Sequence, residues 1–198
     1  MKVLIGCELS GTIRDAFLGL GHDAWSCDIM PTDVPGPHIQ GDVRNILDYD
    51  WDLGIFNPPC TDLAVSGAAW FAAKGMYRQQ TALMLIRELM NAPIPHICIE
   101  NPVSVISSYI RKPDQIIQPW MFGHGETKKT CLWLKNLAPL VPTHYVEGRE
   151  QRLHRLPPSP DRAKIRSKTF AGIAKAMAIQ WCDLSIQPVQ YSLFESAS

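Results

Sequence analysis

The residue with the clearest chemical potential is a cysteine that follows two prolines, in the segment Asn57-Pro58-Pro59-Cys60. The prolines fix two φ angles and remove two amide donors, so the loop is stiff and its carbonyl groups are free to face a ligand. The apolar residues 52–56 precede it and predict a buried strand that presents Cys60 at its carboxyl end. A thiol placed there acts as a nucleophile if its pKa is lowered or a base assists. A structural cysteine in a proline turn is the alternative.

A carboxylate has the same placement in a second segment, Ile97-Cys98-Ile99-Glu100-Asn101-Pro102. Residues 96–99 predict another buried strand, and Asn101 is biased away from helix because it precedes proline. We therefore expect Glu100 to face the same crevice as Cys60, where a carboxyl group can donate a proton. Capping of a helix is the alternative for this glutamate.

Three polar features follow the earlier predicted strands. Residues 3–11, Val-Leu-Ile-Gly-Cys-Glu-Leu-Ser-Gly, pass from a strand into a helix through two glycines, which let a backbone approach a ligand closely. Asp28 ends the second strand, where an acidic side chain can accept hydrogen bonds from ribose hydroxyls. Asp42, in Gly41-Asp42-Val43, is placed to accept from an adenine amino group. Each alone is common in turns, but the series favours an adenosyl cofactor.

The elements that must position these residues alternate between strands and helices. The predicted strands are residues 2–7, 23–28, 52–56 and 96–99, with a later pair near 130–134 and 141–146. The first predicted helix begins with Ser10 or Thr12 as N-cap. Two further helices are predicted over 76–90 and 170–181. This order is typical of an α/β fold with a mostly parallel sheet, in which ligands bind beyond the carboxyl ends of the strands. We expect one domain over residues 1–186 and a C-terminal tail, 187–198.

Composition narrows the class of protein. The 198 residues are 46% hydrophobic and 19% charged with zero net charge, which is typical of a globular chain. No stretch has the roughly 20 apolar residues of a membrane span, and the N-terminus lacks a signal-peptide layout, so we expect a cytoplasmic protein. The six cysteines form no Cys-x-x-Cys pair, so we expect buried thiols apart from Cys60 and neither a disulfide framework nor a metal site.

Residues 144–168 form a basic segment, with seven basic and three acidic side chains. Such a segment permits a polyanionic partner, with a solvated loop as the alternative. Trp70 and Phe71 follow the cysteine loop and are expected in the core rather than stacked on nucleic acid.

Taken in order, these motifs resemble those of cytosine-C5 DNA methyltransferases. That family carries a glycine-bearing cofactor loop, an acidic residue after the second strand, an Asp for adenine, a Pro-Cys nucleophile and a Glu-Asn-Val carboxylate. The resemblance covers residues 3–110 and, more loosely, 167–181, where Thr169–Ala178 looks like the family's last motif. This chain has Thr61 where the family has Gln, Pro102 where it has Val, and no evident target-recognition domain.

The resemblance implies a Rossmann-like S-adenosylmethionine-dependent methyltransferase fold with helices on both faces of the sheet. It implies S-adenosyl-L-methionine as cofactor and DNA as substrate, with RNA as an alternative. Cys60 and Glu100 are the implied catalytic residues. The implied cofactor-binding residues are Gly6, Cys7, Glu8, Leu9, Ser10, Gly11, Asp28, Ile29, Asp42, Val43, Asn57 and Pro58. The implied substrate-binding residues are Pro59, Ser66, Lys128, Lys129, Arg152 and Arg155, with the two lysines in place of the family's arginine pair.

Two other readings stay open. Asn57-Pro58-Pro59 also fits the first three positions of the motif in methyltransferases that act on adenine N6 or cytosine N4, although these place an aromatic residue where this chain has Cys60. The third reading is a non-catalytic nucleotide-binding α/β module.

Overall fold

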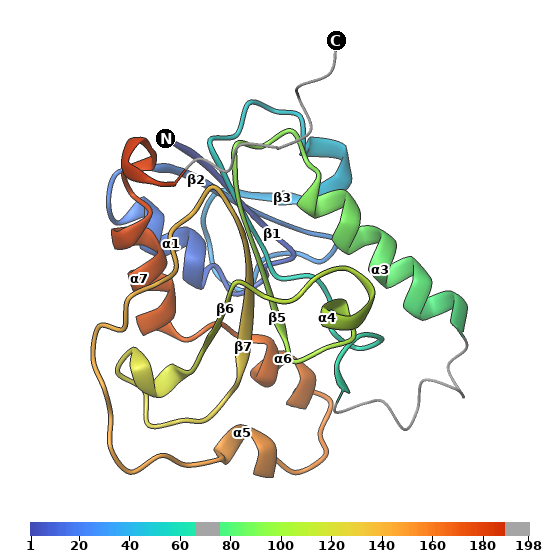
Figure 1. Ribbon diagram of the computed structural model, residues 1–198, viewed down its shortest axis with the longest axis vertical. Helices are drawn as coiled ribbons and strands as arrows, with labels where there is room; N and C mark the ends of the chain where they lie inside the picture. The colour runs from blue at the N-terminus through green and yellow to red at the C-terminus, as the bar shows by residue number, and fades with distance from the viewer. Residues whose placement is uncertain (66–75, 189–198) are drawn as a thin grey trace.

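The computed structural model describes residues 1–65 and 76–188, and its centre is a seven-stranded sheet (Figure 1). The strand order is β3-β2-β1-β4-β5-β7-β6. The strands are β1 (Lys2–Gly6), β2 (Asp23–Asp28), β3 (His38–Gln40), β4 (Leu53–Phe56), β5 (His96–Pro102), β6 (Gln115–Ile117) and β7 (Thr130–Lys135). The first five run parallel, and β7 is antiparallel to both β5 and β6. The expected mostly parallel Rossmann-like α/β fold is confirmed.

Helices cover both faces of this sheet (Figure 1). On one face, α1 (Thr12–Leu18) and α7 (Ala171–Gln180) bury Phe17, Met177 and Trp181 against the sheet. On the other, α3 (Met76–Met90) and α4 (Ile106–Tyr109) pack against Phe56 and Trp133. Shorter elements complete the chain: η1 (Val43–Ile46), η3 (Pro119–Met121), α5 (Arg152–Arg155), α6 (Arg162–Ser167) and η4 (Leu184–Ile186). Within the described residues, no helix has the length and apolar character needed to cross a membrane.

The central strands form because their residues are almost continuously apolar, as strands covered on both faces require. All four residues of β4 are buried, as are Val3–Ile5 of β1. The sequence placed these strands correctly to within a residue or two. The prediction ended β5 too early, at residue 99, because pairing with β7 continues through Glu100 and Asn101 to Pro102.

Two predictions of local structure are wrong. Neither Ser10 nor Thr12 caps α1, because Gly11 occupies the N-cap position in a left-handed conformation and the Glu8 carboxylate accepts from the amides of Ile13 at 2.8 Å and Arg14 at 3.4 Å. Residues 141–146 form no strand: Pro142 lacks an amide donor, and the amides of 143 and 144 donate to the carbonyl of Met121. Besides β5, the strand that pairs with β7 is the short β6.

Arg14 fastens α1 to β2 and to the loop after it. Its side chain is fully buried, with Nε 2.8 Å from Asp15 Oδ1. Its Nη1 donates to Ser26 Oγ at 3.2 Å, and its Nη2 donates to the carbonyl of Pro35 at 3.1 Å. Gly36 leaves room for the guanidinium, since a Cβ there would lie 2.6 Å from its carbon. Each nitrogen of the buried guanidinium therefore has a hydrogen-bond partner.

Replacing Arg14 by alanine is expected to lower the free energy of unfolding by about 3–5 kcal/mol, because it empties a packed site and strips Ser26 of a buried donor. Urea unfolding followed by circular dichroism measures this. The exposed Arg155 supplies the control, and Arg155→Ala is expected to change stability by less than about 0.5 kcal/mol. If Arg14→Ala does not fold, the milder Thr32→Val, which removes one partner of the guanidinium, is expected to cost about 1 kcal/mol. Equal stability of Arg14→Ala and the wild type would contradict this role.

Candidate active site

The polar strand ends converge on a cavity of about 990 Å³ at the carboxyl end of the parallel strands. Residues that follow β1, β2 and β4 line it, together with the last residues of β5 and the two lysines before β7. Residues of the α5–α6 region form the remaining wall, and Figure 1 shows these two helices beyond the lower end of the sheet. The volume lies in the range of small-molecule and cofactor sites.

Cys60 lies at a fixed turn at the edge of this cavity. Its carbonyl accepts from the amides of Leu63 at 3.0 Å and Ala64 at 2.8 Å, so the chain turns immediately after the cysteine. The amide of Asn57 donates to the carbonyl of Gly6 at 2.9 Å, which joins the loop to β1. The proline loop is therefore held at both of its ends.

The strand that carries Glu100 is bound directly to this loop. Nδ2 of the buried Asn101 donates to the carbonyl of Pro58 at 2.9 Å. Beyond these residues, the amide of Val65 donates to the carbonyl of Val103 at 3.1 Å. Cys60 and Glu100 both line the cavity, so the thiol and the carboxyl group open onto one space, as the sequence required of them.

Several charged groups act on the thiol. Burial raises the pKa of Cys60 most, and the Glu100 carboxylate raises this pKa further. Lys128 lowers the pKa, as do the backbone amide of Cys60 and Arg166, but the net direction is upward. The thiol is therefore protonated at neutral pH in the free protein, and attack on a substrate requires loss of that proton.

Because the pKa of Cys60 is raised, its thiolate fraction is expected to keep growing with pH above the value of 9.0 that is ordinary for a thiol. The rate of alkylation by iodoacetamide is measured by mass spectrometry of the peptide that contains Cys60. This rate is expected to keep rising with pH beyond the point at which the alkylation rate of free glutathione levels off. Circular dichroism at each pH establishes that the fold persists. A plateau below pH 8 would contradict a raised pKa.

The cofactor side of the cavity consists of residues after β1 and β2. Cys7 lies there with a φ of 58°, and the Glu8 carboxylate is already engaged in capping α1. Asp28 Oδ1 accepts from the amide of Met30 at 3.0 Å, and Ile29 beside it is 71% exposed. Asn57 Oδ1 is buried with no hydrogen-bond partner within residues 1–65 and 76–188. Of these side chains, the Asp28 carboxylate and the unused Asn57 acceptor line the cavity, and they fit the hydroxyl and amino groups of an adenosyl cofactor.

Most of the residues implied by the resemblance line the cavity. These are Cys7, Glu8, Leu9, Ser10, Asp28, Asn57, Pro58, Pro59, Cys60, Glu100, Lys128 and Lys129. The structure leaves seven others outside the lining: Gly6, Gly11, Ile29, Asp42, Val43, Arg152 and Arg155. Ser66, Trp70 and Phe71 lie outside the described residues.

The residues outside the lining have other neighbours. A Cβ at Gly6 would meet the side chains of Phe56 and Val43, both of which are in the core. Asp42 forms an ion pair with Arg44 at 2.5 Å, which lowers the pKa of its carboxyl group. Arg152 likewise is absent from the lining, and its Nε lies 3.4 Å from carboxylate oxygens of Glu126 and Glu150.

Several lining residues were not identified from the sequence. They are Asp33 and Gln118, while Lys164, Arg166 and Lys168 were recognised only as part of the basic segment. Gln118 Oε1 accepts from the amide of Lys128 at 3.0 Å, which positions the start of β7. Among residues 1–65 and 76–188, no group of three His, Cys, Asp or Glu side chains is arranged to hold a metal ion.

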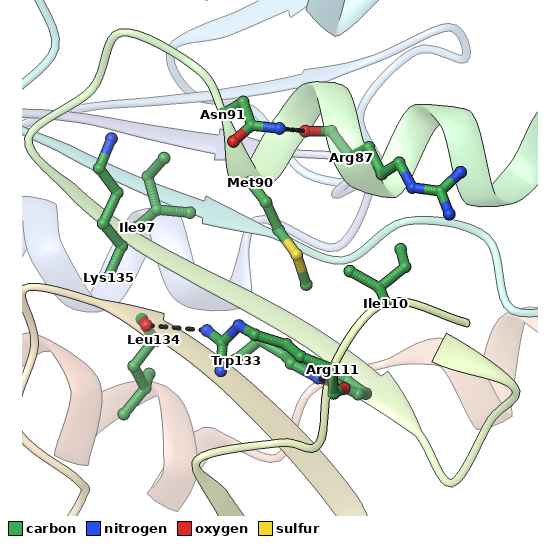
Figure 2. A pocket seen from close by; sticks show the side chains of 9 residues that line it. All are labelled: Arg87, Met90, Asn91, Ile97, Ile110, Arg111, Trp133, Leu134 and Lys135. Carbon is green, nitrogen blue, oxygen red and sulfur yellow. Dashed lines mark hydrogen bonds between the residues drawn. The ribbon is translucent and has the colours of Figure 1, made fainter. Parts of the chain in front are cut away.

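A second cavity, of about 520 Å³, lies between α3, β5 and β7 (Figure 2). Its basic side chains are already engaged: Arg111 donates to the carbonyl of Leu134 at 3.0 Å, and Lys135 donates to the carbonyls of Ala92 and Ile94. Arg87 donates to the carbonyl of Tyr109 at 3.2 Å. None of the residues implied by the resemblance lines this cavity.

Comparison with known proteins finds remote likenesses among solved structures. No family model matches the sequence, and no curated protein matches it. A solved structure described as that of a DNA modification methyltransferase encoded within an E. coli prophage matches with a TM-score of 0.46 and 12% sequence identity. The match covers 68% of this chain and 46% of that chain, so the chain spans about half the length of that protein.

Proposed function

We propose that this protein transfers a methyl group from S-adenosylmethionine to C5 of cytosine in DNA, through a covalent adduct on Cys60. The observation that carries the proposal is that Cys60 and Glu100 open onto one cavity, next to the residues suited to the cofactor. A thiol and a carboxyl group at adjacent strands can act on two positions of a single pyrimidine ring.

The chain's own residues suit each step at the ring. The Cys60 thiolate adds to C6 of cytosine, and the electron pair displaced from the C5–C6 bond moves toward N3. The carboxyl group of Glu100 donates a proton or hydrogen bond at N3, which leaves C5 electron-rich. S-adenosylmethionine, when bound, supplies an electrophilic methyl group on its sulfonium sulfur. Once C5 carries the methyl group, the C5 proton is lost to solvent, the C5–C6 double bond re-forms as the C6–S bond breaks and releases the Cys60 thiolate, and the proton at N3 returns to Glu100.

The surrounding loop supports this chemistry. The carbonyl of Pro59 is a suitable acceptor for the cytosine amino group, because the two prolines leave this loop with fewer amides that could compete for it. Lys128 and Lys129 lie on the side of the cavity opposite the cofactor residues, toward β7. In a duplex the target base is stacked, so the base must leave the helix at a cost of a few kcal/mol to reach Cys60.

The test is transfer of a labelled methyl group to DNA, followed by digestion and separation of the nucleosides. The expected product is 5-methylcytosine. An oligonucleotide that contains 5-fluorocytosine is expected to remain covalently attached to the protein, because fluorine at C5 blocks the loss of a proton that precedes release of Cys60. Absence of both the product and the adduct would refute the proposal.

A second function is favoured by one observation. Asn57 Oδ1 is a buried acceptor with no partner among the described residues, and it begins an Asn-Pro-Pro sequence. Such an acceptor suits an exocyclic amino group, so methylation of adenine N6 or cytosine N4 is the alternative. The same nucleoside analysis separates the two functions, since N6-methyladenine or N4-methylcytosine would replace 5-methylcytosine. Calorimetry that detects no binding of S-adenosylmethionine would instead favour a non-catalytic module.

A further inference from the structure

The charges on the wall of the large cavity are unevenly distributed. The acidic side chains Glu8, Asp28 and Asp33 belong to segments that follow β1 and β2. The basic side chains of 128 and 129 precede β7, on the other side of the sheet in the order β2-β1-β4-β5-β7. Cys60 and Glu100, carried by β4 and β5, therefore lie between an acidic half and a basic half of the cavity.

Helix α6 crosses the cavity from the acidic half to the basic half. At one end, Lys164 Nζ lies 2.6 Å from Asp33 Oδ1, and the amide of Asp33 donates to the carbonyl of Leu9 in the cofactor loop. At the other end, Lys128 Nζ donates to the carbonyl of Lys168 at 3.5 Å. The segment from 164 to 168 is therefore held over the space that contains the thiol.

Arg166 lies between these two attachments and has a free guanidinium. It is half-buried and lines the cavity, and no hydrogen bond or ion pair engages it within residues 1–65 and 76–188. It is close enough to Cys60 to lower the pKa of the thiol. The Lys164 charge, in contrast, is neutralised by Asp33. A planar cation with unused donors facing a cavity is suited to bidentate binding of a phosphate group.

Resting on the proposed function, we infer that Arg166, with Lys168 beside it, binds the phosphate group of the cytosine nucleotide whose base faces Cys60. The phosphate belongs either to a DNA strand or to a free nucleotide, and the two share the same chemistry. The basic half of the cavity thereby takes the anionic substrate, while the acidic half takes the cofactor with its cationic sulfonium. In this way α6 supplies a contact to the substrate.

The experiment measures equilibrium binding rather than turnover. Calorimetry compares dCMP with deoxycytidine, and fluorescence anisotropy compares a single-stranded oligonucleotide with its duplex, each over a range of salt concentrations. Arg166→Gln is expected to weaken binding of dCMP or of the preferred oligonucleotide at least about 10-fold. The slope of the logarithm of the binding constant against the logarithm of the salt concentration is expected to fall by about one phosphate contact. Binding of deoxycytidine, which has no phosphate, is expected to stay unchanged.

The variants include a matched control. Lys168→Gln is expected to weaken binding by a smaller factor, and Lys175→Gln, which removes the same charge from an exposed position on α7 away from the cavity, is expected to have no effect. Arg166→Lys is expected to recover only part of the affinity, because an ammonium group cannot form the paired hydrogen bonds of a guanidinium. Circular dichroism establishes that each variant is folded.

The outcomes separate this inference from the proposed function. Wild-type affinity in Arg166→Gln, or equal loss in Arg166→Gln and Lys175→Gln, overturns the phosphate site even if 5-methylcytosine is produced. Selective loss in Arg166→Gln supports the site even if another base proves to be the one methylated. Tight binding of dCMP with no gain from a longer strand assigns the phosphate to a free nucleotide. Binding that needs the oligonucleotide assigns it to nucleic acid.

Discussion

Replacement of Cys60 by serine is expected to lower the rate of methyl transfer to cytosine at least about 10³-fold, because a hydroxyl group is a far weaker nucleophile than a thiolate. Serine is close to cysteine in size, and the turn at this residue is held by backbone hydrogen bonds from Leu63 and Ala64. The variant is therefore expected to keep its fold and its affinity for DNA and cofactor. Incorporation of label into a cytosine-containing oligonucleotide under saturating conditions measures the loss.

Another cysteine provides the control for this substitution. Cys182 is exposed and does not line the cavity, so Cys182→Ser is expected to retain full activity. Retention of more than a tenth of the wild-type rate in Cys60→Ser would contradict covalent catalysis by Cys60. If the product of the active variant is a methylated amino group, the chemistry is that of the exocyclic-amine reading, in which no nucleophilic side chain is needed.

The fold could be predicted where its determinants are local. The strands β1 and β4 are short apolar runs, and the helix over 76–90 has regular helical periodicity, so composition and spacing suffice to place them. Because the carboxyl ends of parallel strands share one edge of the sheet, the convergence of residues 60 and 100 followed from the same pattern.

The rest of the fold and of the site depends on particular side-chain contacts, which residue patterns in the sequence do not reveal. The cap of α1 is the carboxylate of Glu8, which only the folded turn brings to the amides of residues 13 and 14. The sequence does not show that Asp42 is engaged, but in the structure its carboxylate forms an ion pair with Arg44. The sequence marks Arg166 only as one of the basic residues of 144–168, because α6 has no buried residue and its position over the cavity depends on the pairing of Lys164 with Asp33.

Glu100, which is buried in β5, also separates the two candidate reactions. Methylation at C5 requires a proton donor at N3 of the cytosine, whereas methylation of an exocyclic amino group does not. Glu100→Ala is expected to lower methyl transfer by about 10²–10⁴-fold, because nothing then donates a proton to N3 as the thiolate adds. Glu100→Gln is expected to lose less, since its amide can still donate a hydrogen bond although it cannot transfer a proton. The rates with saturating DNA and cofactor measure both losses. Glu88→Gln, on the exposed surface of α3 outside the cavity, is the charge-matched control.

The same substitutions are expected to move the reactivity of Cys60 in the opposite direction. The Glu100 carboxylate raises the pKa of the Cys60 thiol, so its removal lowers that pKa and increases the thiolate fraction at any pH below it. Alkylation of Cys60 by iodoacetamide is therefore expected to become faster in Glu100→Ala and Glu100→Gln while methyl transfer becomes slower. A variant that had merely lost its structure would also expose the thiol, but it would lose its affinity for cofactor and its circular dichroism signal. Parallel falls in alkylation and methyl transfer would show that Glu100 activates the thiol instead of acting on the pyrimidine ring.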